Sequence, residues 1–271
     1  MKQLILTILM IFATSLGAAK AYIDHQLNVN LERWKHLVIQ EMKVDYQQIY
    51  SSLGGSIIIE QLSLTPSSLF PVYTDKIIFH KAYQLYPVPQ DLSFSIRGVS
   101  ISTHDLNKLW KVDESLIERF RQAGYSSFLA DITLDTHLKD ARLSTFLSID
   151  ASKWGKLEIS LDLDQVPPFT HWTSPMRLSQ FLLVSLKLNY FDQGLVNQLF
   201  AQWTQYDRTA TLEDLKQTVT RQMVFYFGKD NQEKLHQFIE NPKILSIQWQ
   251  PPIPFALQDI WNTFPKDLKV M

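Results

Sequence analysis

The residues able to do chemistry are dispersed along this chain. Its seven histidines are scattered, with no His-Glu-x-x-His pattern, and it has no cysteine for a thiol nucleophile or a thiolate metal site. Neither Gly-x-Ser-x-Gly nor Ser-x-x-Lys occurs, and there is no glycine-rich phosphate loop. We therefore expect no enzyme and no cofactor. A hydrolase assembled from residues distant in sequence is the enzymatic alternative.

Carboxylates provide two further candidate sites. Five of them occupy the polar positions of strand-like segments: Asp131, Asp135, Glu158, Asp162 and Asp164. Gathered together, they could bind Ca²⁺ through oxygen, although a strand offers no carbonyl-rich loop. Asp135 and His137 are two residues apart and share a face, as a carboxylate and an imidazole in an acid–base pair would. We expect a solvated sheet face and a surface pair, and no metal site.

The segments that carry these side chains alternate between apolar and polar residues. Alternation over 130–138, 143–149, 157–163 and 182–188 predicts an antiparallel meander with one apolar and one polar face. Upstream, a glycine-rich turn joins two strands of a predicted hairpin, and further strands are predicted over 76–82 and 92–103. Gly98 predicts a bulge, at which the inward face switches from Phe94 and Ile96 to Val99 and Ile101.

Helical spacing returns in two other parts of the chain. It predicts helices over 104–124 and, in the last third, after Gly194, after Thr211 and over 231–240. Thr211 and Asp214 resemble a capping box. A strand over 244–250 and a short helix over 256–263 follow. The expected fold class is α+β, with the C-terminal helices packing on the antiparallel sheet.

The first residues read as an export signal. Lys2 precedes an uncharged run, residues 4–19, whose helix would cover about 24 Å of a bilayer core of about 30 Å. Counting on to residue 23 gives a signal anchor, with the N-terminus cytoplasmic and the domain periplasmic at an inner membrane. Small residues around Lys20 allow the alternative, cleavage before Tyr22, which yields a periplasmic or secreted protein.

Four segments follow from these patterns. They are a signal anchor or signal peptide over 1–22, an amphipathic helix over 23–43, an antiparallel β-rich region over 44–166, and a mainly helical region over 167–271. The boundary lies at Pro167–Pro168. The helical region is expected to form one compact unit with the sheet. The net charge of −1 gives no global attraction to nucleic acid, so none is expected as a partner.

The strongest strands also suggest where an apolar ligand would bind. Trp154 and Trp172 flank them near turns, either lining the mouth of an apolar groove or packing in an ordinary core. The apolar positions of one strand would form the wall of that groove: Leu157, Ile159, Leu161 and Leu163. The decisive question is whether the helices cover this face or leave it open.

The order of anchor, amphipathic helix, short strand, glycine turn and amphipathic strand resembles the start of AsmA-like envelope proteins. The residues that carry the resemblance are 44–46 and 54–64, and it extends in style over 1–165. It implies an inner-membrane anchor, a β-sheet in the periplasm and a role in organising lipid along an apolar groove. Because the chain also has a leader, a meander and no catalytic motif, we expect a non-enzymatic protein that binds lipid or acts as a scaffold for an envelope protein. The helical tail, 192–263, departs from that pattern. The alternative is a secreted or periplasmic interaction module with a closed core.

Overall fold

A computed structural model describes most of the chain. The described residues are 20–29, 32, 42–52, 54–66, 71–80, 91–103, 105, 118, 120–166, 181–206, 211–256 and 268–271. The predicted membrane segment before residue 20 lies outside them, as do most of the helices predicted over 104–124 and 256–263. Within the described ranges, no helix has the length and apolar character needed to cross a membrane.

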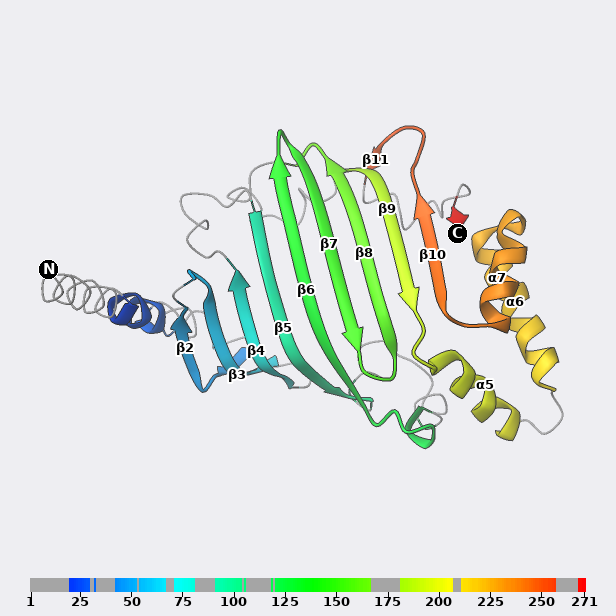
Figure 1. Ribbon diagram of the computed structural model, residues 1–271, viewed down its shortest axis with the longest axis horizontal. Coiled ribbons are helices and arrows are strands. Elements are labelled where there is room, and N and C mark those ends of the chain that lie inside the picture. The colour runs from blue at the N-terminus through cyan, green and yellow to red at the C-terminus, as the bar shows by residue number, and fades with distance from the viewer. Residues whose placement is uncertain are drawn as a thin grey trace, which may run out of the picture.

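In the described part of the chain, the strands form one twelve-stranded sheet (Figure 1). Its spatial order is β1-β3-β4-β5-β6-β7-β8-β9-β10-β12, with β2 also paired to β3 and β11 to β9. The strands are β1 (Met42–Asp45), β2 (Gln48–Ser51), β3 (Ile57–Pro66), β4 (Val72–His80), β5 (Asp91–Ser102), β6 (Ser127–Lys139), β7 (Arg142–Ala151), β8 (Gly155–Asp164), β9 (Leu182–Phe191), β10 (Ile244–Trp249), β11 (Phe255–Ala256) and β12 (Lys269–Val270).

The predicted meander is confirmed, because β6 to β9 pair antiparallel in chain order. The register sets apolar side chains opposite one another across the strands, which keeps them on one face. Asp140 and Ala141 join β6 to β7, and both adopt positive φ, 51° and 63°. Two residues at positive φ give the turn whose twist matches paired strands, which explains so tight a hairpin.

The predicted bulge at Gly98 is also confirmed. The pairing of β5 with β6 shifts register between Ile96 and Val99, and Gly98 has φ +65°. Gln61 on β3 adopts φ +50°, and Ile59 and Leu62, which flank this region, are both buried. The side-chain alternation therefore changes phase in β3 as well as β5, and the apolar residues on both sides of the bulge face the core.

The C-terminal helices lie beyond β10, at one end of the sheet (Figure 1). They are α5 (Leu195–Tyr206), α6 (Leu212–Phe227) and α7 (Gln232–Glu240), with a short 3-10 turn, η3 (Lys229–Asn231), before α7. Thr211 caps α6 through the predicted capping box: its hydroxyl accepts from Asp214 N, and the Asp214 carboxylate accepts from Thr211 N. The fold is α+β, as predicted, with these helices packing on the β10 end.

Several details differ from the sequence prediction. The strand expected at 76–82 is β4, which begins at Val72, and Met42 lies in β1 instead of the amphipathic helix. Ala256 belongs to β11 where a helix was predicted, and β12 was not predicted. Strands β9 and β10, which were predicted over 182–188 and 244–250, follow Pro167–Pro168 and belong to the same sheet as β8. The short strands β1, β11 and β12 form by pairing with residues distant in the chain, and local periodicity gives no indication of such pairing.

Candidate functional site

The middle of the apolar face carries a half-buried stripe of hydrophobic side chains. Two rows run across the strands from β5 to β9, as the register shows. We call eight of their residues the central stripe: Phe94, Ile132, Leu134, Leu147, Ile149, Leu157, Ile159 and Leu188. At a strand spacing of about 4.8 Å the stripe is roughly 19 Å across. None of the eight belongs to the clusters of buried residues found elsewhere on the sheet.

Those buried clusters surround the stripe. Toward β1–β4, one cluster includes Val44, Ile59 and Ile77. Toward β10, a second joins α5–α7 to the sheet through residues such as Phe238 and Leu245. A third covers the end of β6–β9, where its members, each at most 9% exposed, include Leu138, Leu143, Leu163 and Leu183. Helices α5–α7 lie at the β10 end and the helix 20–29 lies beside β2, so none of these helices lies over the stripe (Figure 1).

The four predicted groove residues of β8 share one face but have different surroundings. Leu157 stands opposite Ile149 and Tyr190, and Ile159 stands opposite Leu147 and Leu188, so both belong to the central stripe.

Further along β8, toward Asp164, the apolar side chains are more deeply buried. Leu161 packs against the third cluster, and Leu163, only 5% exposed, is one of its members. On β8, the half-buried apolar positions are therefore Leu157, Ile159 and Leu161, and Leu163 is buried.

Trp154 lies in the turn between β7 and β8, inside an aromatic cluster. Its ring stacks on Phe120 at 5.1 Å and meets Tyr125 and Phe128 edge-on at 5.0 and 5.8 Å. Its Nε1 donates to Ser127 O, and its carbonyl accepts from the Tyr190 hydroxyl. These contacts hold the β7–β8 turn against the segment that leads into β6. Trp172, the second predicted groove residue, lies outside the described residues.

Burial and the neighbouring Asp192 carboxylate change the acidity of Tyr190, which borders the stripe. Its hydroxyl lies 2.9 Å from Asp192 Oδ1. Burial first, and then this contact, raise the pKa of the phenol. Tyr190 therefore stays neutral and keeps its proton for these hydrogen bonds.

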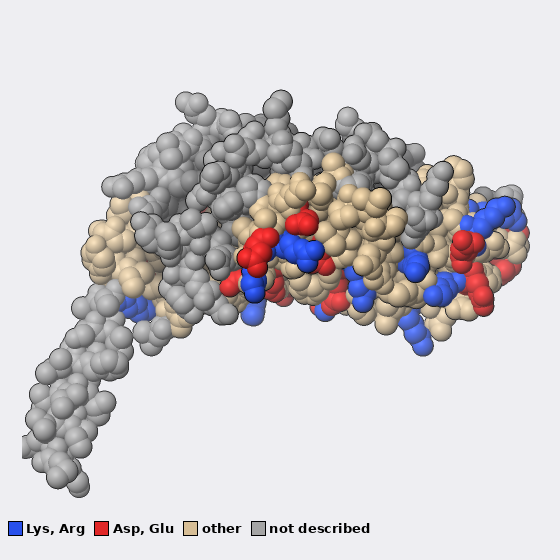
Figure 2. Space-filling model, turned by 90° about the horizontal axis from the view of Figure 1, so that it is seen from above, with Lys and Arg blue, Asp and Glu red and all other residues tan. Residues whose placement is uncertain are grey.

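The carboxylates of the opposite face do not gather into a cation site. Each of them is engaged locally: Asp131 accepts from Gly98 N, Asp135 from Ser93, and Asp162 from both Ser144 and Ser185. Glu158 pairs with Lys156, and Asp164 accepts from Gln165 N. No group of three or more histidine and carboxylate side chains suited to a metal occurs in the part of the chain described. Seen from above, acidic and basic residues lie in mixed groups (Figure 2).

The predicted pair of Asp135 and His137 does not meet. His137 Nδ1 instead bonds the Asp91 carboxylate on β5, and Asp135 accepts from Ser93 on the same strand. Both side chains thus reach across to the neighbouring strand instead of along their own. The contacts are exposed, which fits a hydrogen-bonded surface ladder that ties β5 to β6.

Glu60 organises the polar face near the other end of the sheet. Its carboxylate accepts from Gln48 Nε2 at 2.5 Å and Tyr50 Oη at 2.8 Å, and it pairs with Lys76 Nζ at 2.9 Å. The hydrogen bonds from Gln48, Lys76 and Tyr50 lower the pKa of Glu60 to about 2. One carboxylate thereby joins β2, β3 and β4, a role that the sequence did not reveal.

A pocket of about 560 Å³ lies between α7 and the strands β10 and β12. Apolar residues, among them Phe238, Ile244 and Val270, line it together with Lys234 and Lys243. The pocket combines segments far apart in the chain, so no local sequence pattern could have indicated it. Because Glu240 and the last turn of α7 also line it, its charge is mixed.

Comparison with known proteins adds one match. A family model described as "Uncharacterized protein" matches residues 148–270, a stretch that begins in β7 and ends in β12. It therefore includes the β8 part of the central stripe and the helices α5–α7. No curated protein matches the chain.

Proposed function

We propose that this chain is a membrane-anchored, non-enzymatic envelope protein that binds acyl chains of lipid along the central stripe. The observation that carries the proposal is the half-buried state of all eight stripe residues in the middle of a sheet whose ends are well packed. A contiguous apolar surface that remains accessible marks a site for an apolar ligand. Acyl chains fit it because the stripe itself offers no polar group.

The division of the sheet into two faces supports the same proposal. Ser148, Glu158 and Ser160 alternate with stripe residues on β7 and β8 and point to the opposite, hydrogen-bonding face. A lipid tail would therefore be held on one side while the other side remains in water. The resemblance of 44–64 to AsmA-like proteins points the same way.

The proposed location is the inner membrane, with the sheet on the periplasmic side. The uncharged run 4–19 with Lys2 before it supports a retained anchor. Residues 20–29 are helical and lie beside β2, which would keep the sheet close to the bilayer (Figure 1). The alternative of cleavage before Tyr22 leaves most of this helix on the mature protein. The mass of the mature N-terminus distinguishes the two.

The test uses a photoreactive side chain on either face of one strand. p-Benzoylphenylalanine at Ile159 faces the stripe, and the same group at Ser160, the next residue, faces the polar side. We expect lipid adducts at Ile159 and none at Ser160 when the full chain is irradiated in its membrane. Mass spectrometry of the cross-linked peptide identifies the lipid class.

A pair of substitutions provides the matched control. Ile159→Glu introduces a charge into the stripe, and Ser160→Glu introduces it on the polar face. Lipid released by organic solvent from gently purified protein should fall for Ile159→Glu and stay unchanged for Ser160→Glu. Equal labelling of both faces, or unchanged lipid content in Ile159→Glu, would contradict acyl-chain binding.

An exposed aromatic pair favours a second candidate function, binding of an envelope protein. Phe225 and Tyr226 near the end of α6 are 84% and 59% exposed, and their rings meet edge-on at 5.4 Å. Exposed aromatic side chains are typical anchors of protein interfaces. Loss of a co-purifying protein from a Phe225→Ser variant, with lipid content unchanged, would assign this role to α6.

A further inference from the structure

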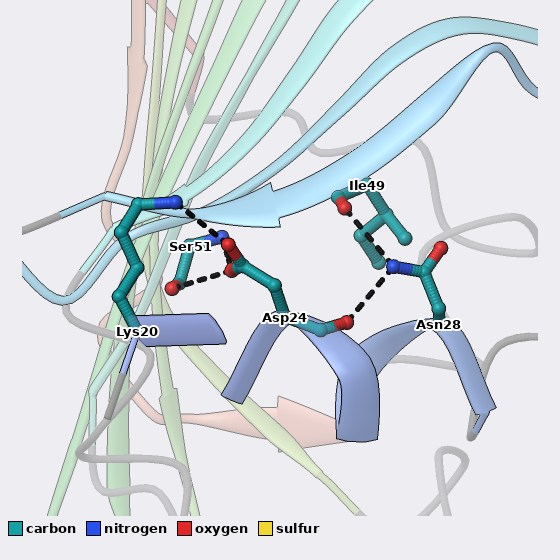
Figure 3. Close-up of polar contacts among 5 residues, drawn as sticks. All are labelled: Lys20, Asp24, Asn28, Ile49 and Ser51. Atoms are coloured by element: carbon teal, nitrogen blue, oxygen red, sulfur yellow. Dashed lines mark hydrogen bonds and ion pairs between the residues drawn. The ribbon is translucent and has the colours of Figure 1, made fainter. Parts of the chain in front are cut away.

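The edge strand β2 is closed by side chains of a helix instead of by another strand. Asp24 Oδ1 accepts hydrogen bonds from Ser51 N at 2.5 Å and from Ser51 Oγ at 2.7 Å. Four residues on, Asn28 Nδ2 donates to Ile49 O at 3.4 Å and to Asp24 O at 2.8 Å (Figure 3). Ile49 and Ser51 present these groups on the edge of β2 that faces away from β3, so the helix occupies positions where a neighbouring strand would bond.

This closure protects an edge whose side chains offer little protection beyond the short length of β2, four residues. Edge strands are usually guarded by lysine, proline or an inward charge. The sequence of β2 is Gln-Ile-Tyr-Ser, which contains none of these and includes two residues that favour strands. Without the helix, an uncharged edge with open backbone groups would face solvent.

Few contacts attach the helix 20–29 to the sheet, and half of its side chains are exposed. Residues 21–23, 25 and 26 are exposed, and Leu27 is the one residue of the described helix 20–29 that packs against the neighbouring buried cluster. Lys20 binds Asp24 at 2.6 Å, but their side chains remain 37% and 21% exposed. Burial alone would raise the pKa of Asp24, yet the bonds from Lys20 and Ser51 bring it below its usual value, so Asp24 stays ionised near neutral pH.

The opposite end of the sheet is closed more firmly. Asn231, 7% exposed, donates from Nδ2 to Leu268 O at 2.8 Å and to Phe227 O at 2.6 Å, and its Oδ1 accepts from Val270 N at 2.9 Å. A primary amide thus takes the place of a strand beside β12. The hydrogen bonds of Asn231 to Leu268 and Val270 are buried, whereas those of Asp24 and Asn28 to β2 are only partly buried. The β2 edge is therefore the end of the sheet that can open.

We propose that β2 is a strand-pairing edge for a second copy of this chain, which residues 20–29 keep closed until the helix is displaced. An edge that pairs with itself antiparallel places a two-fold axis perpendicular to the sheet. The apolar faces of both copies then lie on the same side. Ile49 and Val44, both buried on that face, would continue the apolar surface from one copy into the next. This inference does not depend on lipid binding.

The test compares oligomeric state in the full chain, purified in detergent. Asp24→Ala with Asn28→Ala frees both edge groups and should convert the mass of one chain, 31.6 kDa, to twice that value by native mass spectrometry. Lys20→Ala leaves both edge bonds in place and should remain monomeric. Adding Ser51→Pro to the double variant removes the outward N–H and should restore the monomer.

Site-directed cross-linking adds a second measurement, because the chain has no cysteine of its own. If Ile49 of one copy pairs with Ser51 of the other, Tyr50 lies on the two-fold axis. In the double variant, Tyr50→Cys should therefore form a disulfide between copies, while Ser144→Cys on the exposed polar face should not.

Slow hydrogen exchange of the backbone amides in β6–β8 would show that the sheet of the double variant is folded. If these amides exchange rapidly, the test is repeated with the single variant Asn28→Ala. A folded variant that stays monomeric, or a dimer that persists with Ser51→Pro, would overturn the proposal.

Discussion

Single carboxylates tie neighbouring strands together on the polar face of this sheet. Asp162 accepts from serines on both adjacent strands, and Glu60 accepts from Gln48 and Tyr50 on one side and pairs with Lys76 on the other. Such contacts occur beside lysine–glutamate pairs on the same face, such as Lys156 with Glu158. Their donors are largely uncharged hydroxyl and amide groups, so their strength depends on the carboxylate being ionised.

Glu60 should therefore make stability sensitive to acid. The pKa of Glu60 is about 2 in the folded protein against 4.5 for the free group, so its contribution is complete above pH 4.5 and is lost as pH falls toward 2. Glu60→Gln should be less stable than the natural protein at pH 7, and the difference should shrink below pH 4.5. Urea unfolding followed by tryptophan fluorescence at several pH values measures it.

Glu118→Gln is the control for this experiment. Glu118 is exposed and pairs with Arg121 within its own helical turn. A stability difference that does not change between pH 5 and pH 2 for Glu60→Gln would contradict the role assigned to Glu60.

At the scale of elements, the bulge at Gly98 allows a long strand to keep its apolar residues on one face. A β-carbon at Gly98 would lie 2.0 Å from Asp75 Oδ2, and the residue has φ +65°. Gly98 N also donates to Asp131 Oδ1 at 2.9 Å, which fixes the bulge to β6. The site has no room for a side chain and a backbone shape that favours glycine.

Gly98→Ala should destabilise the protein by about 1–3 kcal/mol through backbone strain, with a further loss from displacement of Asp75. Gly124→Ala is a matched control, because Gly124 has φ +87° with nothing within 4 Å of the added carbon. The difference between the two variants in urea unfolding measures the contact with Asp75. Equal losses would show that Asp75 moves aside freely.

The elements also show what local sequence can predict. Alternation predicted β6 to β9, the Thr211–Asp214 pair predicted the start of α6, and Gly98 predicted the bulge, because each signal lies within a few residues. The bonds that close the two edges of the sheet, such as Asp24 to Ser51, join residues distant in the chain, so no local pattern contains them.

The candidate site shows the same division. The apolar face of β8 could be predicted, because alternation places Ile159 and Leu163 on one side of the strand. The half-open state of Ile159 and the burial of Leu163 depend on what packs over each position, which involves other strands and the segments around them.

At the scale of the whole molecule, one buried amide holds the C-terminal edge. Asn231→Ala leaves Val270 N and Leu268 O without their partner, which costs about 1–3 kcal/mol for each buried group. We expect a lower free energy of unfolding and fast hydrogen exchange at Val270.

Asn241→Ala changes the same residue type at an exposed position after α7 and should have little effect. Slow exchange at Val270 in the Asn231→Ala variant would show that another group bonds this edge.

The order of the strands also bears on how the protein reaches its final shape. From β3 to β10, every strand pairs with the one that precedes it in the chain. A contact map of this kind is dominated by near neighbours, which favours rapid folding. The sheet can grow one hairpin at a time as the polypeptide emerges from the ribosome or a translocation pore, with β12 arriving last to complete it.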